Sequence, residues 1–156
     1  MSRNAVARTQ AELDAEVRRT IYDSFISDHN SISMEQVAAR LGEKTATVGA
    51  VFGRLAEARV LVLQPGSGEV LMAAPFSAVP TAFRVEAASG AWWGNCIWDA
   101  LGVIAMTGVD ASVITSCADC GEAMSLTVEG SDLRPAQAIA HFAIPAAHWW
   151  DDVVFT

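Results

Sequence analysis

The 156-residue chain is apolar and sparsely charged: 52% hydrophobic and 18% charged residues indicate a folded globule rather than a disordered chain. No run of eighteen apolar residues occurs and the N-terminal stretch lacks a signal-peptide core, so we expect no membrane span and a cytoplasmic location. An odd number of cysteines, three, argues against a disulfide framework.

The net charge of −8 is unevenly distributed along the chain. Residues 1–85 hold nine Lys/Arg and nine Asp/Glu, whereas residues 86–156 hold only Arg134 against nine acids. This break predicts two domains, which we place at 1–80 and 81–156. The deficit of cations argues against nucleic-acid binding by the whole chain, because neutralising phosphates requires a cation surplus.

Three helices are expected in the first domain. Apolar residues recur every fourth position and predict a helix over about 10–27. Two more helices are expected in "SISMEQVAARLG" and "KTATVGAVFGRLAEARV". Capping boxes are predicted at the start of the first helix, Thr9 with Glu12, and of the second, Ser33 with Gln36. The second helix is expected to stop at Gly42, and Thr45 is the predicted N-cap of the third.

A hairpin is predicted after these helices, from two apolar runs around a Pro-Gly-Ser-Gly turn. Three helices and a hairpin are typical of a winged-helix domain, with the third helix in the recognition position. That helix offers only Arg54 and Arg59, both late, whereas base-reading residues usually lie near its start. A winged-helix regulator that senses thiol-reactive ligands therefore stays open as a weakened alternative.

The second domain is predicted to be α+β. We expect a strand in "TAFRVEA", a helix over about 92–106 that ends near Gly108, and two strands, "ASVITSC" and "AMSLTVEG", joined by the turn "CADCG". A further strand is expected in "QAIAHFAIP", and "AAHWWDDVVFT" is predicted to be a short helical turn running into a strand. The predicted fold is thus a winged-helix-like N-terminal domain followed by a small mixed α/β core domain.

Cys96 and Asp99 form the first candidate site. In a helix they share one face, and the positive end of the helix dipole favours a thiolate at Cys96, so we expect it to be the most reactive thiol. A shared proton would allow Asp99 to act as a proton donor beside that thiolate. The tryptophans Trp92, Trp93 and Trp98 would exclude water and line an apolar substrate pocket. The alternative is that Cys96 is an ordinary buried thiol and Asp99 a solvated helix residue.

Cys117 and Cys120 form a C-x-x-C pair that is half of a zinc knuckle. The second pair is absent, so zinc is weakly supported. Cys96 could add a third metal ligand, and His141 and His148 are the other candidates. The alternatives are a dithiol site for a soft metal and two ordinary thiols.

The stretch "WWGNCIWDALGVIAMTGVDASVITSCADCGEAMSLTVEG" resembles the core of the alkylmercury lyases. The resemblance extends from about residue 20 onward and is most specific over 92–130. It implies an alkylmercury-lyase-like core domain and a detoxifying protonolysis of carbon–mercury bonds, with Hg(II) as product or bound ligand and no required cofactor. By position, Cys96 corresponds to the nucleophilic cysteine, Asp99 to the acid, and Cys117 to a cysteine that the family treats as structural.

One departure from the family pattern concerns the second catalytic cysteine, which the resemblance implies would follow the segment "HWWDDVVFT". Activity is therefore expected to be impaired unless Cys120, the spare thiol, lies within about 5 Å of Cys96. The alternative function is a soft-metal or small-ligand binding protein of the same fold without full catalysis.

Overall fold

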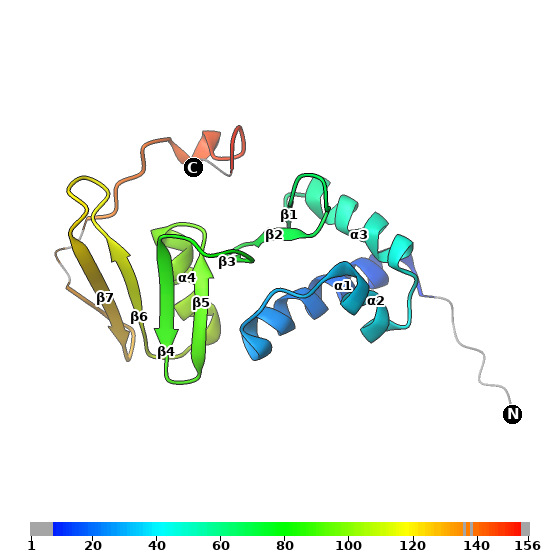
Figure 1. Cartoon of the computed structure of the whole chain (residues 1–156), viewed down its shortest axis with the longest axis horizontal. Coiled ribbons are helices and arrows are strands. Elements are labelled where there is room, and N and C mark those ends of the chain that lie inside the picture. Colours follow the sequence, from blue (N-terminus) through cyan, green and yellow to red (C-terminus); the bar gives the residue numbers. More distant parts are fainter. Residues whose placement is uncertain (1–7, 136, 138, 154–156) are drawn as a thin grey trace, which may run out of the picture. The chain divides into compact units, whose positions relative to one another are not determined.

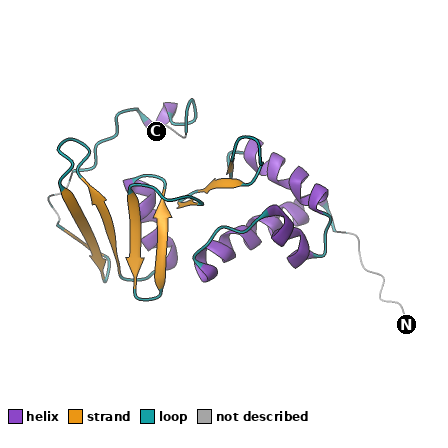
Figure 2. Cartoon of the chain, viewed as in Figure 1, coloured by secondary structure: helices purple, strands orange, loops and turns teal. Residues whose placement is uncertain are grey.

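A computed structural model describes residues 8–135, 137 and 139–153 and divides the chain into two compact units, residues 1–79 and 80–156 (Figure 1). Helices dominate the first unit and antiparallel strands the second (Figure 2). This order agrees with the predicted α+β class. The winged-helix class of the first unit stays a prediction.

The helical unit begins with α1 (Gln10–Asp23), which continues into a π-helical turn (Ser24–Asp28), and follows with α2 (Met34–Leu41) and α3 (Thr45–Glu57). The capping boxes predicted at Thr9 and Ser33 are both formed, and Gly42 ends α2 in a left-handed conformation. The N-cap predicted at Thr45 is wrong by one residue, because Lys44 has the extended backbone and Thr45 is already helical.

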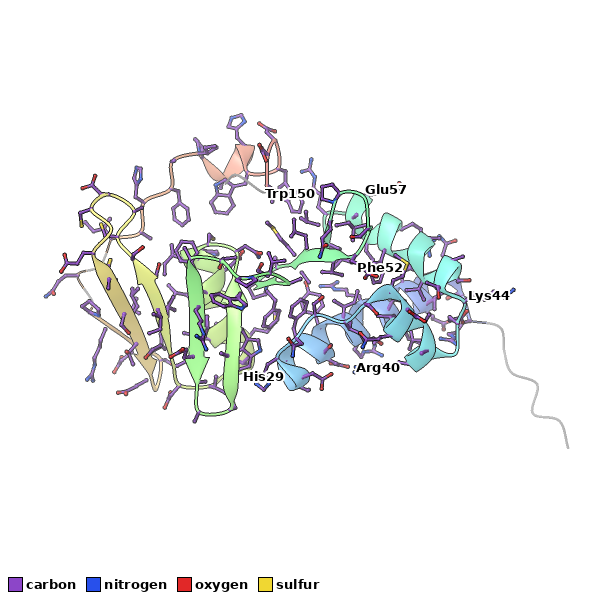
Figure 3. All side chains as sticks on the ribbon, in the orientation of Figure 1. His29, Arg40, Lys44, Phe52, Glu57 and Trp150 are labelled. Carbon is purple, nitrogen blue, oxygen red and sulfur yellow. The ribbon has the colours of Figure 1, made fainter. Side chains whose placement is uncertain are left out.

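Aliphatic and aromatic side chains from all three helices form the core of this unit. Phe52 on α3 is fully buried and points inward between the helices (Figure 3). Val17 and Ile21, one helical turn apart on α1, are equally inaccessible. Three short antiparallel strands follow: β1 (Val62–Leu63), β2 (Val70–Ala73) and β3 (Phe76–Ser77). The predicted hairpin corresponds to β1 and β2, and β3 was not predicted.

The second unit contains β4 (Phe83–Ala87), β5 (Gly90–Gly94), α4 (Ile97–Thr107), β6 (Ala111–Ser116), β7 (Ala123–Glu129) and β8 (Asp132–Arg134). All strand pairs are antiparallel, in the order β5-β4-β6-β7-β8. Helix α4 packs against β4, β5 and β6. Val103 and Ile104 of the helix and Val85 and Val113 of the sheet are buried and belong to the core of this unit.

Two predicted elements of this unit are wrong. Residues 92–94 belong to strand β5 rather than to the helix, which begins at Ile97. The stretch "QAIAHFAIP" forms no strand among its described residues, 137 and 139–145, and Ile139 is 92% exposed. Prolines 135 and 145 bracket it and lack the backbone N–H that a strand partner needs. The predicted helical turn is confirmed as a 3-10 turn, Ala146–His148, whereas the strand predicted at the chain end falls partly outside the described residues.

No helix among the described residues is long and apolar enough to span a membrane.

Candidate thiol–carboxylate site

Cys96 lies where β5 ends and α4 begins. The end of β5 is held by Thr81, whose hydroxyl donates a 2.6 Å hydrogen bond to the carbonyl of Gly94. Gly94 lies so close to α4 that a Cβ there would be 2.6 Å from the backbone nitrogen of Ala100. Only glycine allows this close approach without a shift of backbone atoms, and it brings the strand directly into the first turn of α4.

Cys96 caps α4 with its sulfur. Its backbone is extended (φ −145°, ψ −178°), and the backbone N–H of Asp99 donates to Cys96 Sγ over 3.4 Å. The sulfur thus takes the place of the Ser or Thr oxygen that usually accepts this bond at an N-cap. The prediction that Cys96 lies at a helix start beside Asp99 is confirmed, although the helix starts later than expected.

The predicted charge state of Cys96 is wrong. Burial raises the pKa of the half-buried thiol, and the nearby Asp99 carboxylate raises it further, while hydrogen bonds from the backbone N–H groups of Asp99 and Trp98 act in the opposite direction. The helix terminus does act on the sulfur as predicted, but the loss of water around it outweighs that effect. Cys96 therefore favours the neutral thiol until a ligand replaces its proton.

The pKa of the Asp99 carboxyl is also raised. Burial raises the pKa of its carboxyl group, and a hydrogen bond from the Asn95 amide, 2.8 Å between Nδ2 and Oδ2, partly offsets that rise. The prediction that Asp99 can hold a proton is supported by this direction. Asn95 was missed in the sequence, although its spacing of four residues from Asp99 is one at which amide and carboxylate side chains commonly pair along a helix.

The three tryptophans have different surroundings. Trp92 is 4% exposed and belongs to the core, so it does not line an open pocket. Trp93 is half-buried and pairs across the strands with Arg84, whose guanidinium lies 5.6 Å from the ring centroid. Trp98, on the first turn of α4, is 63% exposed. Trp98 is thus an exposed large ring on this turn, and the lining of a substrate pocket by these tryptophans stays a prediction.

Cys117 and Cys120 lie apart from Cys96, in the turn between β6 and β7. Hydrogen bonds to Cys117 from the backbone N–H groups of Cys120 and Asp119, and from the Cys120 thiol, lower the pKa of Cys117. No group of three His, Cys, Asp or Glu side chains within the described ranges could hold a metal ion. The predicted three-cysteine metal set, Cys96 with Cys117 and Cys120, is therefore not assembled, and the weak zinc hypothesis gains no support.

Comparisons with known proteins identify the family. A family model described as "MerB: Alkylmercury lyase" matches residues 76–156. The chain belongs to the alkylmercury lyase family. Among solved structures it is similar to one entitled "Crystal structure of the mercury-bound form of MerB2", with a TM-score of 0.62 and 23% identity, covering 77% of this chain and 57% of that one. No curated protein matches. The resemblance expected from residues 92–130 is thus confirmed, and this chain spans a little over half the length of that MerB2 structure.

Proposed function

We propose that this chain cleaves carbon–mercury bonds by protonolysis, with Cys96 binding mercury and Asp99 delivering the proton. One observation carries the proposal: a thiol and a carboxyl whose pKa values are both raised lie on the same first turn of α4, linked by the 3.4 Å hydrogen bond from the Asp99 N–H to Cys96 Sγ. A soft metal prefers thiolate ligands, and a carboxyl that favours its proton is a suitable general acid. Membership of the family agrees with the cleavage of a carbon–mercury bond.

The raised pKa values suggest a path for the proton. An organomercurial cation displaces the proton of Cys96 as the mercury–sulfur bond forms, and the Asp99 carboxylate accepts that proton. Asp99 then protonates the carbon bound to mercury. The carbon–mercury bond breaks with its electron pair staying on carbon, which yields the hydrocarbon and leaves Hg(II) on Cys96. Asn95 holds the carboxyl in place through its 2.8 Å hydrogen bond.

A second thiolate would accelerate the cleavage. One thiolate holds R–Hg–S in a linear arrangement with little negative charge on carbon, whereas a second raises the electron density on mercury and weakens its bond to carbon. Cys117 and Cys120 follow β6, and β4 separates β6 from β5, which leads to Cys96. We therefore expect turnover to depend on an added small thiol.

The decisive experiment measures methane released from methylmercury by gas chromatography, with and without excess thiol. We expect Cys96→Ser to lose activity. Asp99→Asn should bind methylmercury but release methane about a hundredfold more slowly or worse, as is usual when a general acid is removed. Asp132→Asn is the matched control, because it removes an exposed carboxylate of the same unit on β8.

Two outcomes would change the assignment. Methane release by Asp99→Asn at the rate of the unaltered protein would exclude Asp99 as the acid. Binding of methylmercury through Cys96 without methane release, even with added thiol, would instead support the alternative of a soft-metal binding protein without catalysis.

The regulator alternative is not favoured by the geometry of α3. Arg54, one of its two late cations, forms a two-pronged ion pair with Asp14 of α1, with Nε to Oδ2 at 3.1 Å. A guanidinium held by a carboxylate of its own unit is a poor phosphate ligand, because binding a phosphate would require that pair to break.

A further inference from the structure

The turn between β6 and β7 holds two cysteines in a closed loop. Strand pairing continues to Ser116 and Ala123, and beyond it the Cys117 N–H donates to the carbonyl of Glu122 over 2.8 Å. The N–H of Gly121 donates back to the carbonyl of Cys117 over 2.9 Å, and Gly121 has the left-handed φ of +74° that such a turn requires. The turn that carries both cysteines is thus closed by backbone hydrogen bonds at the end of a paired hairpin.

The two cysteines lie three residues apart within this closed turn. The neighbouring backbone N–H groups of Cys120 and Asp119 and the Cys120 side chain lower the pKa of Cys117, which favours its thiolate. Cys120 is exposed and Cys117 is half-buried, so a ligand can reach the pair from solvent. No step of the proposed lyase reaction uses either thiol.

We propose that Cys117 and Cys120 form a second metal site, a surface dithiol that binds one Hg(II) as a two-coordinate S–Hg–S bridge. Binding releases two protons, one from each thiol, and involves no change of oxidation state. A two-thiolate site suits a soft cation that is satisfied by two sulfur ligands. It does not suit zinc, which needs four ligands, because the described residues supply no third His, Cys, Asp or Glu to this group.

The dithiol lies at the same end of the sheet as Cys96. That its Hg(II) comes from the cleavage of an organomercurial at Cys96 rests on the proposed lyase function. Trp93, Arg84 and Ile114 form one row across β5, β4 and β6. Cys96 follows Trp93 by three residues and Cys117 follows Ile114 by three, and β5 and β6 run in the same direction. Both sites therefore lie at the same end of the sheet, about two strand spacings or 10 Å apart at that row. Figure 1 shows the β6–β7 turn and the end of β5 at this common end.

The test uses the full chain with Cys96→Ser, which removes the thiol of the proposed lyase site, and inorganic mercuric chloride as the probe. The reduced protein is loaded with one equivalent, passed through a desalting column in excess glutathione, and its mercury content is measured by elemental mass spectrometry. We expect about one Hg per chain.

Adding Cys120→Ser should reduce the retained mercury about tenfold or more, since a tethered second thiol acts at a millimolar or higher effective concentration. Cys117→Ser is the second test variant. Glu122→Gln, in the same turn, keeps both thiols and is the matched control.

A second readout separates chelation from single-thiol binding. In the Cys96→Ser protein, one equivalent of Hg(II) should protect Cys117 and Cys120 from alkylation together. Equal retention by the Cys96→Ser/Cys120→Ser protein, or protection of only one thiol, would overturn the proposal. Because no organomercurial and no Cys96 are present, the result does not depend on lyase activity, and failure of one proposal leaves the other standing.

Discussion

Replacing Gly94 with alanine tests whether the close approach of β5 to α4 sets the geometry of the thiol–carboxylate site. The new Cβ would lie 2.6 Å from the nitrogen and 2.7 Å from the Cα of Ala100, whereas ordinary contacts begin at 3.4 Å. The first turn of α4 would have to retreat by about 0.8 Å, because backbone atoms cannot swing aside as side-chain atoms do. Cys96 and Asp99 lie on this turn and would move with it.

Two effects follow from that displacement. Overpacking of this size typically costs about 1–3 kcal/mol of unfolding free energy, which lowers Tm by roughly 5–15 °C for a unit of this size. A misplacement approaching 1 Å at reacting groups can reduce turnover by about a hundredfold. We expect both losses, measured by thermal unfolding and by methane release from methylmercury.

Gly53→Ala is the control for this variant. Gly53 lies in α3, where an added Cβ would meet nothing within 4 Å, so alanine should stabilise the helix by up to about 1 kcal/mol. If Gly94→Ala unfolds at the same temperature as the unaltered protein and retains its turnover, the argument that glycine sets the position of α4 is refuted.

Three further predictions concern thiol reactivity, the tryptophans and acid sensitivity. Limited alkylation at neutral pH should label Cys117 before Cys96, because the pKa of Cys117 is lowered and that of Cys96 is raised; peptide mapping that finds Cys96 first would contradict this order. Trp92→Ala should lower the free energy of unfolding in urea by about 3–5 kcal/mol. Trp98→Ala removes an exposed ring, so it should lower that free energy by less than about 1 kcal/mol and alter organomercurial binding instead. Equal losses of stability would contradict the difference in burial. The Arg54 guanidinium lowers the pKa of Asp14. The stability from this pair is therefore present above the ordinary carboxyl pKa of about 3.9 and is lost as the pH falls through the lowered value. Asp14→Asn should be less stable than the unaltered protein at pH 7 and should lose less stability on acidification, and urea unfolding at each pH measures both differences.

Helix ends were predictable because their signals are local. The capping boxes at Thr9 and Ser33 and the glycine stops at Gly42 and Gly108 depend on residues within one turn, and all four are formed. Strand β5 was not predicted, because its residues 92–94 were assigned to the helix that follows it. Its tryptophans favour a strand, but the decisive contact is the pairing with β4, which the sequence order does not reveal.

The position of the candidate site was predictable, whereas its electrostatics were not. Cys96 and Asp99 are three residues apart, so a helix start brings them together wherever it lies in the fold. The direction of the Cys96 pKa shift depends on burial, which arises when α4 packs on the sheet. The separation of Cys96 from the Cys117–Cys120 pair is likewise set by strand order, since β4 lies between β5 and β6.

The raised pKa of Asp99 implies that the carboxyl is retained at a cost to stability. Because burial raises the folded-state pKa above the unfolded value of about 3.9, the folded state binds the proton more tightly. The stability that this group contributes is fully present below about pH 3.9 and is lost as the pH rises through the raised pKa.

Asp99→Asn keeps an oxygen for the Asn95 amide but has no proton to lose. Its unfolding free energy, relative to that of the unaltered protein, should therefore increase as the pH rises from about 4 and level off above the raised pKa. Urea unfolding of both proteins at pH 4, 5, 6, 7 and 8 measures this difference, and the titrations of other groups cancel in it. A difference that is constant with pH would show that folding leaves the pKa of Asp99 unchanged. A difference that favours the unaltered protein more at pH 8 than at pH 4 would show that the folded protein stabilises the Asp99 carboxylate. Either result would remove the physical basis for its role as a proton donor.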